Sequence, residues 1–146
     1  MGWCVINPKG TDVITLQKGD QLPLFELKDQ DGVLFNIKDV VGQKNLIIYF
    51  YPKDDTPGCI KEACKFRDDF EVFTDLDALV IGISGDTPES HKEFKEKYQL
   101  PFTLLSDVDD VVRKQFGVEG TFRGLIPGRV TFVVDREGII QYTFDS

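Results

Sequence analysis

The sequence predicts an α/β fold in which a mixed central sheet is flanked by helices, with a β-hairpin near the N-terminus. Two observations carry this prediction. Continuous apolar runs rich in β-formers, at residues 45–51 and 78–84, are typical of strands that are buried on both faces. Segments with the helical spacing of apolar residues follow these runs, and an alternation of buried strands with helices is characteristic of α/β sheets.

Two hairpins are expected, one at each end of this pattern. Residues 24–37 alternate apolar and polar side chains about Asp31 and Gly32, which favours a hairpin with its turn at that point. Near the C-terminus, residues 129–135 and 139–144 flank a short Arg-Glu-Gly turn and predict a closing hairpin. The closing strands complete the expected mixed sheet.

Three helices are expected between the hairpins. The first covers residues 57–73, where Phe66, Phe70 and Phe73 recur at helical spacing. Thr87 is the expected N-cap of the second helix, which covers residues 87–100. The remaining predicted elements are a short strand at 102–106 and a helix at 108–118 closed by Gly117. Right-handed crossovers place the loops after the central strands at one end of the sheet, where ligand sites of such folds lie.

Composition narrows the classes of partner. We expect one domain over residues 1–146, a length that needs neither disulfides nor metals to bury a core. The net charge of −8 argues against nucleic acid and against anionic membrane surfaces. We find neither a membrane-length apolar run nor a signal peptide, and three cysteines are typical of an intracellular chain. The expected location is therefore the cytoplasm.

The segment Tyr-Pro-Lys-Asp-Asp-Thr-Pro-Gly-Cys, residues 51–59, places a thiol where a reactive one is expected. Thr56 or its neighbour can cap the following helix, Pro57 suits its first position, and Cys59 falls in its first turn. Free amide groups and the helix dipole favour a thiolate there. Complete ionisation of an ordinary thiol gains only about 30-fold at neutral pH, so a fast reaction also needs groups that orient the electrophile.

The second thiol, Cys64, lies five residues further on the same predicted helix. Five helical residues separate two Cα atoms by about 8.6 Å and turn them roughly 140° apart, beyond the reach of a disulfide. The pair therefore forms no bond at all, or bonds only after the helix turn between the thiols unwinds. A permanent structural disulfide is excluded.

Other chemistries have weaker support. Zinc requires four ligands, and the available set would be Cys4, Cys59, Cys64 and His91, in which the two helical thiols diverge. His91 could pair with a nucleophilic cysteine, but it lies in register with Phe94 and Tyr98, so a packed helical histidine is the favoured interpretation. No nucleotide-binding motif is found, and no cofactor or metal is expected.

The motif of residues 50–64 resembles the peroxiredoxins of the bacterioferritin comigratory protein or peroxiredoxin Q type. Their pattern Pro-x-x-x-Thr-x-x-Cys is matched by Pro52, Thr56 and Cys59, and Cys64 matches the second cysteine of this subgroup. Glu62 also fits. The similarity extends over about residues 18–144.

This resemblance implies a thioredoxin-like fold and a thiol peroxidase. Cys59 would be the peroxidatic cysteine and Cys64 the resolving cysteine, joined in an intramolecular disulfide that thioredoxin or a similar dithiol protein reduces. The substrates would be hydrogen peroxide and organic hydroperoxides. Thr56 would hold thiolate and peroxide, and Pro52 would shield the pocket.

Three further residues receive roles through the same resemblance. Arg129 would stabilise the thiolate and the developing oxygen charge, whereas its spacing alone leaves a solvated strand-edge residue equally open and Arg67 and Arg123 as competitors. The amide of Gly58 would act like an oxyanion hole together with that of Cys59. Glu62 would line the substrate site.

The resemblance also sets expectations beyond the site. A monomer is expected, and plastid relatives leave the chloroplast as the alternative to the cytoplasm. Ile60 stands where the family usually has threonine. The sequence stops at Thr-Phe-Asp-Ser, residues 143–146, where relatives continue through a final helix, so that helix is expected to be missing. A peroxide-sensing interaction protein, or a binding module with idle cysteines, stays open as the alternative to an enzyme.

Overall fold

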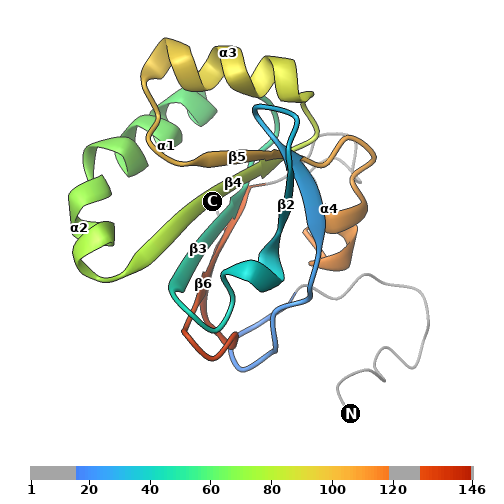
Figure 1. Ribbon diagram of the computed structural model, residues 1–146, viewed down its shortest axis with the longest axis vertical. Helices are drawn as coiled ribbons and strands as arrows, with labels where there is room; N and C mark the ends of the chain where they lie inside the picture. Colours follow the sequence, from blue (N-terminus) through green and yellow to red (C-terminus); the bar gives the residue numbers. More distant parts are fainter. Residues whose placement is uncertain (1–15, 119–128, 146) are drawn as a thin grey trace.

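The computed structural model describes residues 16–118 and 129–145, and a seven-stranded sheet forms its centre (Figure 1). The strand order is β2-β1-β5-β4-β3-β6-β7. The strands are β1 (Glu26–Asp29), β2 (Leu34–Asn36), β3 (Asn45–Phe50), β4 (Ala78–Ser84), β5 (Thr103–Ser106), β6 (Val130–Val134) and β7 (Ile140–Asp145). The helices are η2 (Ile37–Asp39), α1 (Pro57–Asp68), α2 (Phe70–Asp75), α3 (Pro88–Tyr98) and α4 (Val111–Gln115).

The sheet is mixed, as predicted. β3, β4 and β5 run parallel, and β1, β2, β6 and β7 join the sheet through antiparallel pairs. Both predicted hairpins are confirmed, with β1 paired to β2 and β6 paired to β7. Because β3, β4 and β5 are parallel, the loops that follow them emerge at one edge of the sheet.

Alternating side chains of the central strand β3 pack into two separate cores, one on each face of the sheet. Leu46, Ile48 and Phe50 belong to the core that also contains Val112 of α4. Ile47 and Tyr49 belong to the core beneath α1 and α3. The period-two alternation of β3 therefore places apolar residues on both faces, which is why its sequence is a continuous apolar run.

The helices differ from the prediction in two places. The expected helix 57–73 is divided, because α1 ends at Asp68 and α2 begins at Phe70. Asp69 lies between them with φ −96° and ψ 11°. The phenylalanines on both sides of the break pack against the same core, so their spacing concealed it. The helix expected over 108–118 is also shorter, since α4 starts at Val111.

The core beneath α1 contains a stack of aromatic rings. Tyr49 of β3 stacks on Phe66 of α1 with ring centroids 4.7 Å apart and on Tyr51 at 5.3 Å. The Tyr49 ring also lies over Gly82, where an added Cβ would lie 2.9 Å from the tyrosine hydroxyl and 2.9 Å from a methyl group of Leu104. Only a glycine leaves room for this ring.

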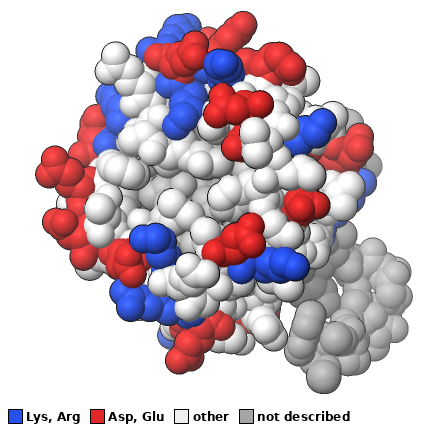
Figure 2. Space-filling model, in the orientation of Figure 1, with Lys and Arg blue, Asp and Glu red and all other residues white. Residues whose placement is uncertain are grey.

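Acidic and basic side chains are interspersed on the face shown in Figure 2, without one continuous basic area. This distribution agrees with the acidic composition of the chain. Among the residues that the structure describes, no helix is long and apolar enough to cross a membrane.

Candidate active site

The motif residues lie at the edge of the sheet where β3, β4 and β5 end. Residues 51–56 connect β3 to α1, and α1 begins at Pro57. Arg129 reaches the same edge from another direction, because it precedes Val130, which pairs with Phe50 at the end of β3. The fold thus brings together two segments that lie about seventy positions apart in the sequence.

Cys59 lies in the first turn of α1, as predicted. Its thiol is free, and the residue is buried, with an exposed fraction of 3%. The first hydrogen bond at this helix end runs from the amide of Ile60 to the carbonyl of Thr56 at 2.8 Å. The amides of Gly58 and Cys59 find no acceptor among the described residues. Two unpaired N–H groups beside a thiol are suited to stabilise negative charge on sulfur or oxygen.

Arg129 lies directly against the start of α1. A Cβ added at Gly58 would lie 2.7 Å from Nη1 of Arg129 and 3.3 Å from its Cζ. Glycine at this position therefore lets the guanidinium cover the first turn. Arg67, a competitor for this role, instead donates to the carbonyl of Tyr98 at 2.7 Å. Arg123, the other competitor, lies outside the described residues, as does Cys4.

Thr56 occupies the N-cap position of α1, but its side chain makes no capping bond. Its hydroxyl donates to the carbonyl of Lys53 at 3.0 Å instead. The expectation that Thr56 or its neighbour caps the helix is thus confirmed for the position of Thr56, but no side-chain capping bond forms. With its hydrogen directed to Lys53, the hydroxyl keeps its lone pairs free to accept a hydrogen bond. Pro52 is half-buried in the same loop.

Glu62 follows Cys59 by one helical turn and is half-buried. Burial raises the pKa of its carboxyl, and the charge of Arg129 acts in the opposite direction. Its Oε1 is buried and has no hydrogen-bond partner among the described residues, and the same holds for the hydroxyl of Tyr49. Burial, followed by the nearby charge of Glu62, raises the pKa of Tyr49 well above its usual value. One oxygen of the half-buried Glu62 carboxyl is thus buried without a hydrogen-bond partner among the described residues.

Cys64 is half-exposed on the same helix and has a free thiol. Both thiols lie on one continuous helix, Pro57–Asp68, which is the geometry that excludes a bond between them without unwinding. The structure therefore agrees with the sequence-based argument for the reduced chain.

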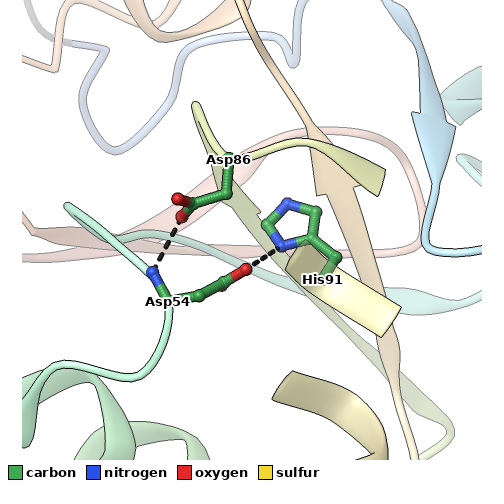
Figure 3. A group of neighbouring side chains, drawn as sticks. All are labelled: Asp54, Asp86 and His91. Carbon is green, nitrogen blue, oxygen red and sulfur yellow. Dashed lines mark hydrogen bonds and ion pairs between the residues drawn. The ribbon is translucent and has the colours of Figure 1, made fainter. Parts of the chain in front are cut away.

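His91 is fully buried in α3, and the prediction of a packed histidine is confirmed. Its Nδ1 lies 2.7 Å from Oδ2 of Asp54 (Figure 3). Its Nε2 lies 2.9 Å from the carbonyl oxygen of Leu105. Asp54, Asp86 and His91 each offer a ligand atom within 4.8 Å of the others, a set that could hold a metal ion. Hydrogen bonds from neighbouring groups already engage these atoms, so the arrangement requires no ion.

Asp54 and Asp86 are not among the residues that the sequence predicts for the site. Asp54 lies in a polar turn, where sequence alone indicates a solvated side chain, yet it is buried. The one available signal is position, since both aspartates follow the carboxyl ends of buried strands. Their proximity to His91 depends on the fold.

The site and the fold define a thiol-containing member of the thioredoxin-like α/β proteins, and the chain belongs to the AhpC/TSA family, whose model matches residues 18–143. It is 50% identical over 131 residues to Peroxiredoxin Q, chloroplastic, of Oryza sativa subsp. japonica, which covers 90% of this chain and 60% of that relative. Peroxiredoxin Q, chloroplastic, of Populus jackii is 48% identical over 138 residues, covering 94% and 64%. The chain thus spans about three fifths of the length of these curated relatives.

Solved structures agree. Peroxidoxin BcpB from Mycobacterium tuberculosis superposes with a TM-score of 0.83 at 34% identity, covering 90% of this chain and 86% of that one. A cysteine-to-serine mutant of PrxQ from Xylella fastidiosa gives a TM-score of 0.83 at 30% identity, covering 90% and 87%. These similarities confirm the resemblance to peroxiredoxin Q and the thioredoxin-like fold.

Proposed function

We propose that the protein is a thiol peroxidase that reduces hydrogen peroxide and organic hydroperoxides through Cys59. The observation that carries the proposal is the surroundings of this thiol. It is buried at a helix start, beside two unpaired amides, and the guanidinium of Arg129 lies against the preceding residue, Gly58. Each of these groups favours negative charge, which develops on oxygen as a peroxide bond breaks. Membership of the AhpC/TSA family supports the same chemistry.

The first step transfers one oxygen atom to sulfur. The Cys59 thiolate attacks one peroxide oxygen, the S–O bond forms, and the O–O bond breaks. The leaving hydroxide or alkoxide takes a proton and departs as water or alcohol, and Cys59 becomes a sulfenic acid. Sulfur is oxidised and the peroxide is reduced, so no further reductant is needed for this step.

The neighbouring residues act on the peroxide before and during this step. Arg129 and the amides of Gly58 and Cys59 stabilise the charge on sulfur and oxygen. The Thr56 hydroxyl, which donates to Lys53, accepts a hydrogen bond from the peroxide hydroxyl. Pro52 shields the thiol from water, and Glu62 lines the approach beside Arg129.

Cys64 resolves the sulfenic acid. Its thiolate attacks the sulfur of Cys59, an S–S bond forms, and water leaves. Because both residues lie on one helix in the reduced protein, α1 must unwind between them first. A dithiol protein of the thioredoxin type then reduces the disulfide by thiol–disulfide exchange.

Cys59→Ser tests the function. We expect this variant to show no peroxide consumption above the level without protein, because a serine hydroxyl is not ionised at neutral pH. The measurement is peroxide consumption with thioredoxin, its reductase and reduced nicotinamide cofactor. Cys64→Ser is the matched control, and it should still form one sulfenic acid per chain. Full turnover by Cys59→Ser would contradict the proposal.

The partner of Cys59 in the disulfide is a separate prediction. Peptide mass spectrometry after one equivalent of peroxide should find Cys59 joined to Cys64 within one chain. A bond to Cys4, or a bond between two chains, would overturn the intrahelical pairing. Oxidation that no dithiol reductant reverses would instead favour the peroxide-sensing interaction protein.

Location and assembly complete the proposal. The curated relatives reported above are named chloroplastic, which supports the plastid alternative over the expected cytoplasm. We propose a plastid location and a monomer. Imaging of the protein with a fluorescent tag at its C-terminus tests the location, and analytical ultracentrifugation of the reduced and oxidised forms tests the assembly.

A further inference from the structure

The loop between β3 and α1 is fastened to the protein through Asp54. Its backbone N–H donates to Oδ2 of Asp86 at 2.7 Å. Its carboxylate accepts hydrogen bonds from the hydroxyls of Tyr51 at 2.6 Å and Ser90 at 2.8 Å. Pro52 and Thr56 lie two residues away on either side. The position of Asp54 therefore determines where the loop presents both motif residues.

The ring of His91 approaches the same carboxylate through Nδ1 (Figure 3), and its Nε2 faces the carbonyl oxygen of Leu105. The carbonyl oxygen of Leu105 only accepts, so Nε2 carries a hydrogen. A bare Nδ1 and a carboxylate oxygen would repel each other at 2.7 Å, so a second proton lies between His91 and Asp54.

The surrounding groups favour the position of this proton on His91. An imidazole is ordinarily a stronger base than a carboxylate. The hydroxyls of Tyr51 and Ser90 donate to Asp54 and stabilise its charged form. The carboxylate of Asp86 lies within 4.8 Å of both groups and therefore does not decide between them. The basicity of the ring and the hydrogen bonds donated to Asp54 act in the same direction.

We propose that His91, as an imidazolium paired with the Asp54 carboxylate, is a positioning residue for the attack of Cys59 on peroxide, which rests on the proposed function. It touches neither Cys59 nor the peroxide. It acts through Asp54, and thereby holds Pro52 and Thr56 in the places from which they meet the substrate. The side chains of the pair are 0% and 4% exposed, so loss of either partner leaves an uncompensated buried group.

Nuclear magnetic resonance tests the protonation without any variant. The chain contains one histidine, so ¹⁵N-histidine labelling reports on His91 alone. In reduced, chelator-treated protein at neutral pH we expect a one-bond N–H coupling at each ring nitrogen. A single coupling, at Nε2 only, would overturn the imidazolium. This measurement decides that point even where a substitution at His91 fails to fold.

Single-turnover kinetics test the positioning. His91→Leu removes both N–H groups, and we expect the rate of Cys59 oxidation by hydrogen peroxide to fall by about 10- to 100-fold. Alkylation of Cys59 by iodoacetamide needs a thiolate but no oriented peroxide. The rate of alkylation in His91→Leu should therefore stay close to that of the unchanged protein. Asp54→Asn, with His91 intact, should keep more of the peroxide rate than His91→Leu does, because an amide N–H can donate to a neutral ring while its oxygen accepts from Tyr51.

Lys92→Ala, at the exposed neighbouring position of α3, is the control and should react like the unchanged protein. An undiminished peroxide rate in His91→Leu, or an equal fall of both rates, would overturn the positioning role. Failure of the unchanged protein to react with peroxide would instead count against the proposed function, so the two failures are distinguishable.

Discussion

Helices α1 and α3 begin alike, with a threonine followed by a proline at the first helical position, and have 12 and 11 residues. They differ in how they are held. In α3, the Thr87 hydroxyl accepts a hydrogen bond from the Ser90 amide. Lys95 donates to the carbonyls of Leu100 and Phe102 at 2.7 Å beyond the C-terminal end of α3. The helix is thus tied down at both ends.

Helix α1 has fewer attachments. Its N-cap threonine makes no side-chain capping bond, and Cys59 and Ala63 are its fully buried residues. Phe66 stacks on Tyr49, and Arg67 donates to the carbonyl of Tyr98, the last residue of α3. Helix α1, which contains both thiols, is thus attached in part to α3, which contains none. This difference suits a reaction in which α1 unwinds while α3 keeps its place.

The largest effects on stability are expected from two single variants, each of which truncates one phenylalanine to alanine. Phe94 of α3 is buried, and Phe94→Ala should lower the free energy of unfolding by about 3–5 kcal/mol. Phe66 of α1 is half-buried, and Phe66→Ala should cost about 2 kcal/mol. Urea unfolding measures both.

The same two variants, Phe66→Ala and Phe94→Ala, distinguish an effect on global stability from an effect on the rate of disulfide formation. Phe66→Ala should accelerate formation of the Cys59–Cys64 disulfide, by up to about tenfold for each 1.4 kcal/mol removed from the closed helix. Phe94→Ala should leave that rate unchanged despite its greater cost. Quenched-flow mass spectrometry gives the rates, and a faster disulfide in Phe94→Ala alone would reverse the assignment of the mobile helix.

A smaller effect is expected from the two cap threonines. Thr87→Ala should destabilise the protein by about 1 kcal/mol, because it removes a capping bond. Thr56→Val should cost less, since the hydroxyl caps nothing and the Lys53 carbonyl can bond to water. We expect the order to invert for oxidation by peroxide, with a fall of about 10²-fold in Thr56→Val only. If Thr56→Val and Thr87→Ala slowed oxidation by peroxide equally, Thr56 would have no role in the site.

The smallest effect is expected at Glu62, whose pKa burial raises from about 4.5. For such a group the contribution to stability is complete below the unfolded pKa and is lost as the pH rises through the folded pKa. Glu62→Gln removes this loss, so its stability relative to the unchanged protein should grow as the pH rises above about 4.5. Urea unfolding at several pH values measures the trend, and Glu71→Gln on the exposed side of α2 should show none.

Much of the fold follows from periodicity. Strand β4 occupies residues 78–84 as predicted, because seven consecutive small or apolar residues suit a strand covered on both faces. The position of Cys59 at a helix start also follows, from the Thr-Pro-Gly sequence before it. Local chemistry determines both features, which is why a single sequence suffices.

Features that depend on distant contacts are not predicted. The break at Asp69 is invisible in the spacing of Phe66, Phe70 and Phe73, because both helices face one core. The burial of Asp54 depends on His91, 37 positions away. The hydroxyl of Thr56 turns to the Lys53 carbonyl although the local sequence favours a cap. In each case a contact distant in sequence, or a competing acceptor, overrides the local preference.

The absence of a side chain at Gly82 has a consequence for the thiol beyond the aromatic stack. The ring of Tyr49 packs against Gly82 on one side and stacks on Phe66, a residue of α1. A methyl group at position 82 would lift the tyrosine ring, and the ring would push the helix away from the sheet. How deeply Cys59 is sheltered from water is therefore determined inside the neighbouring strand, by a hydrogen atom where any other residue has carbon.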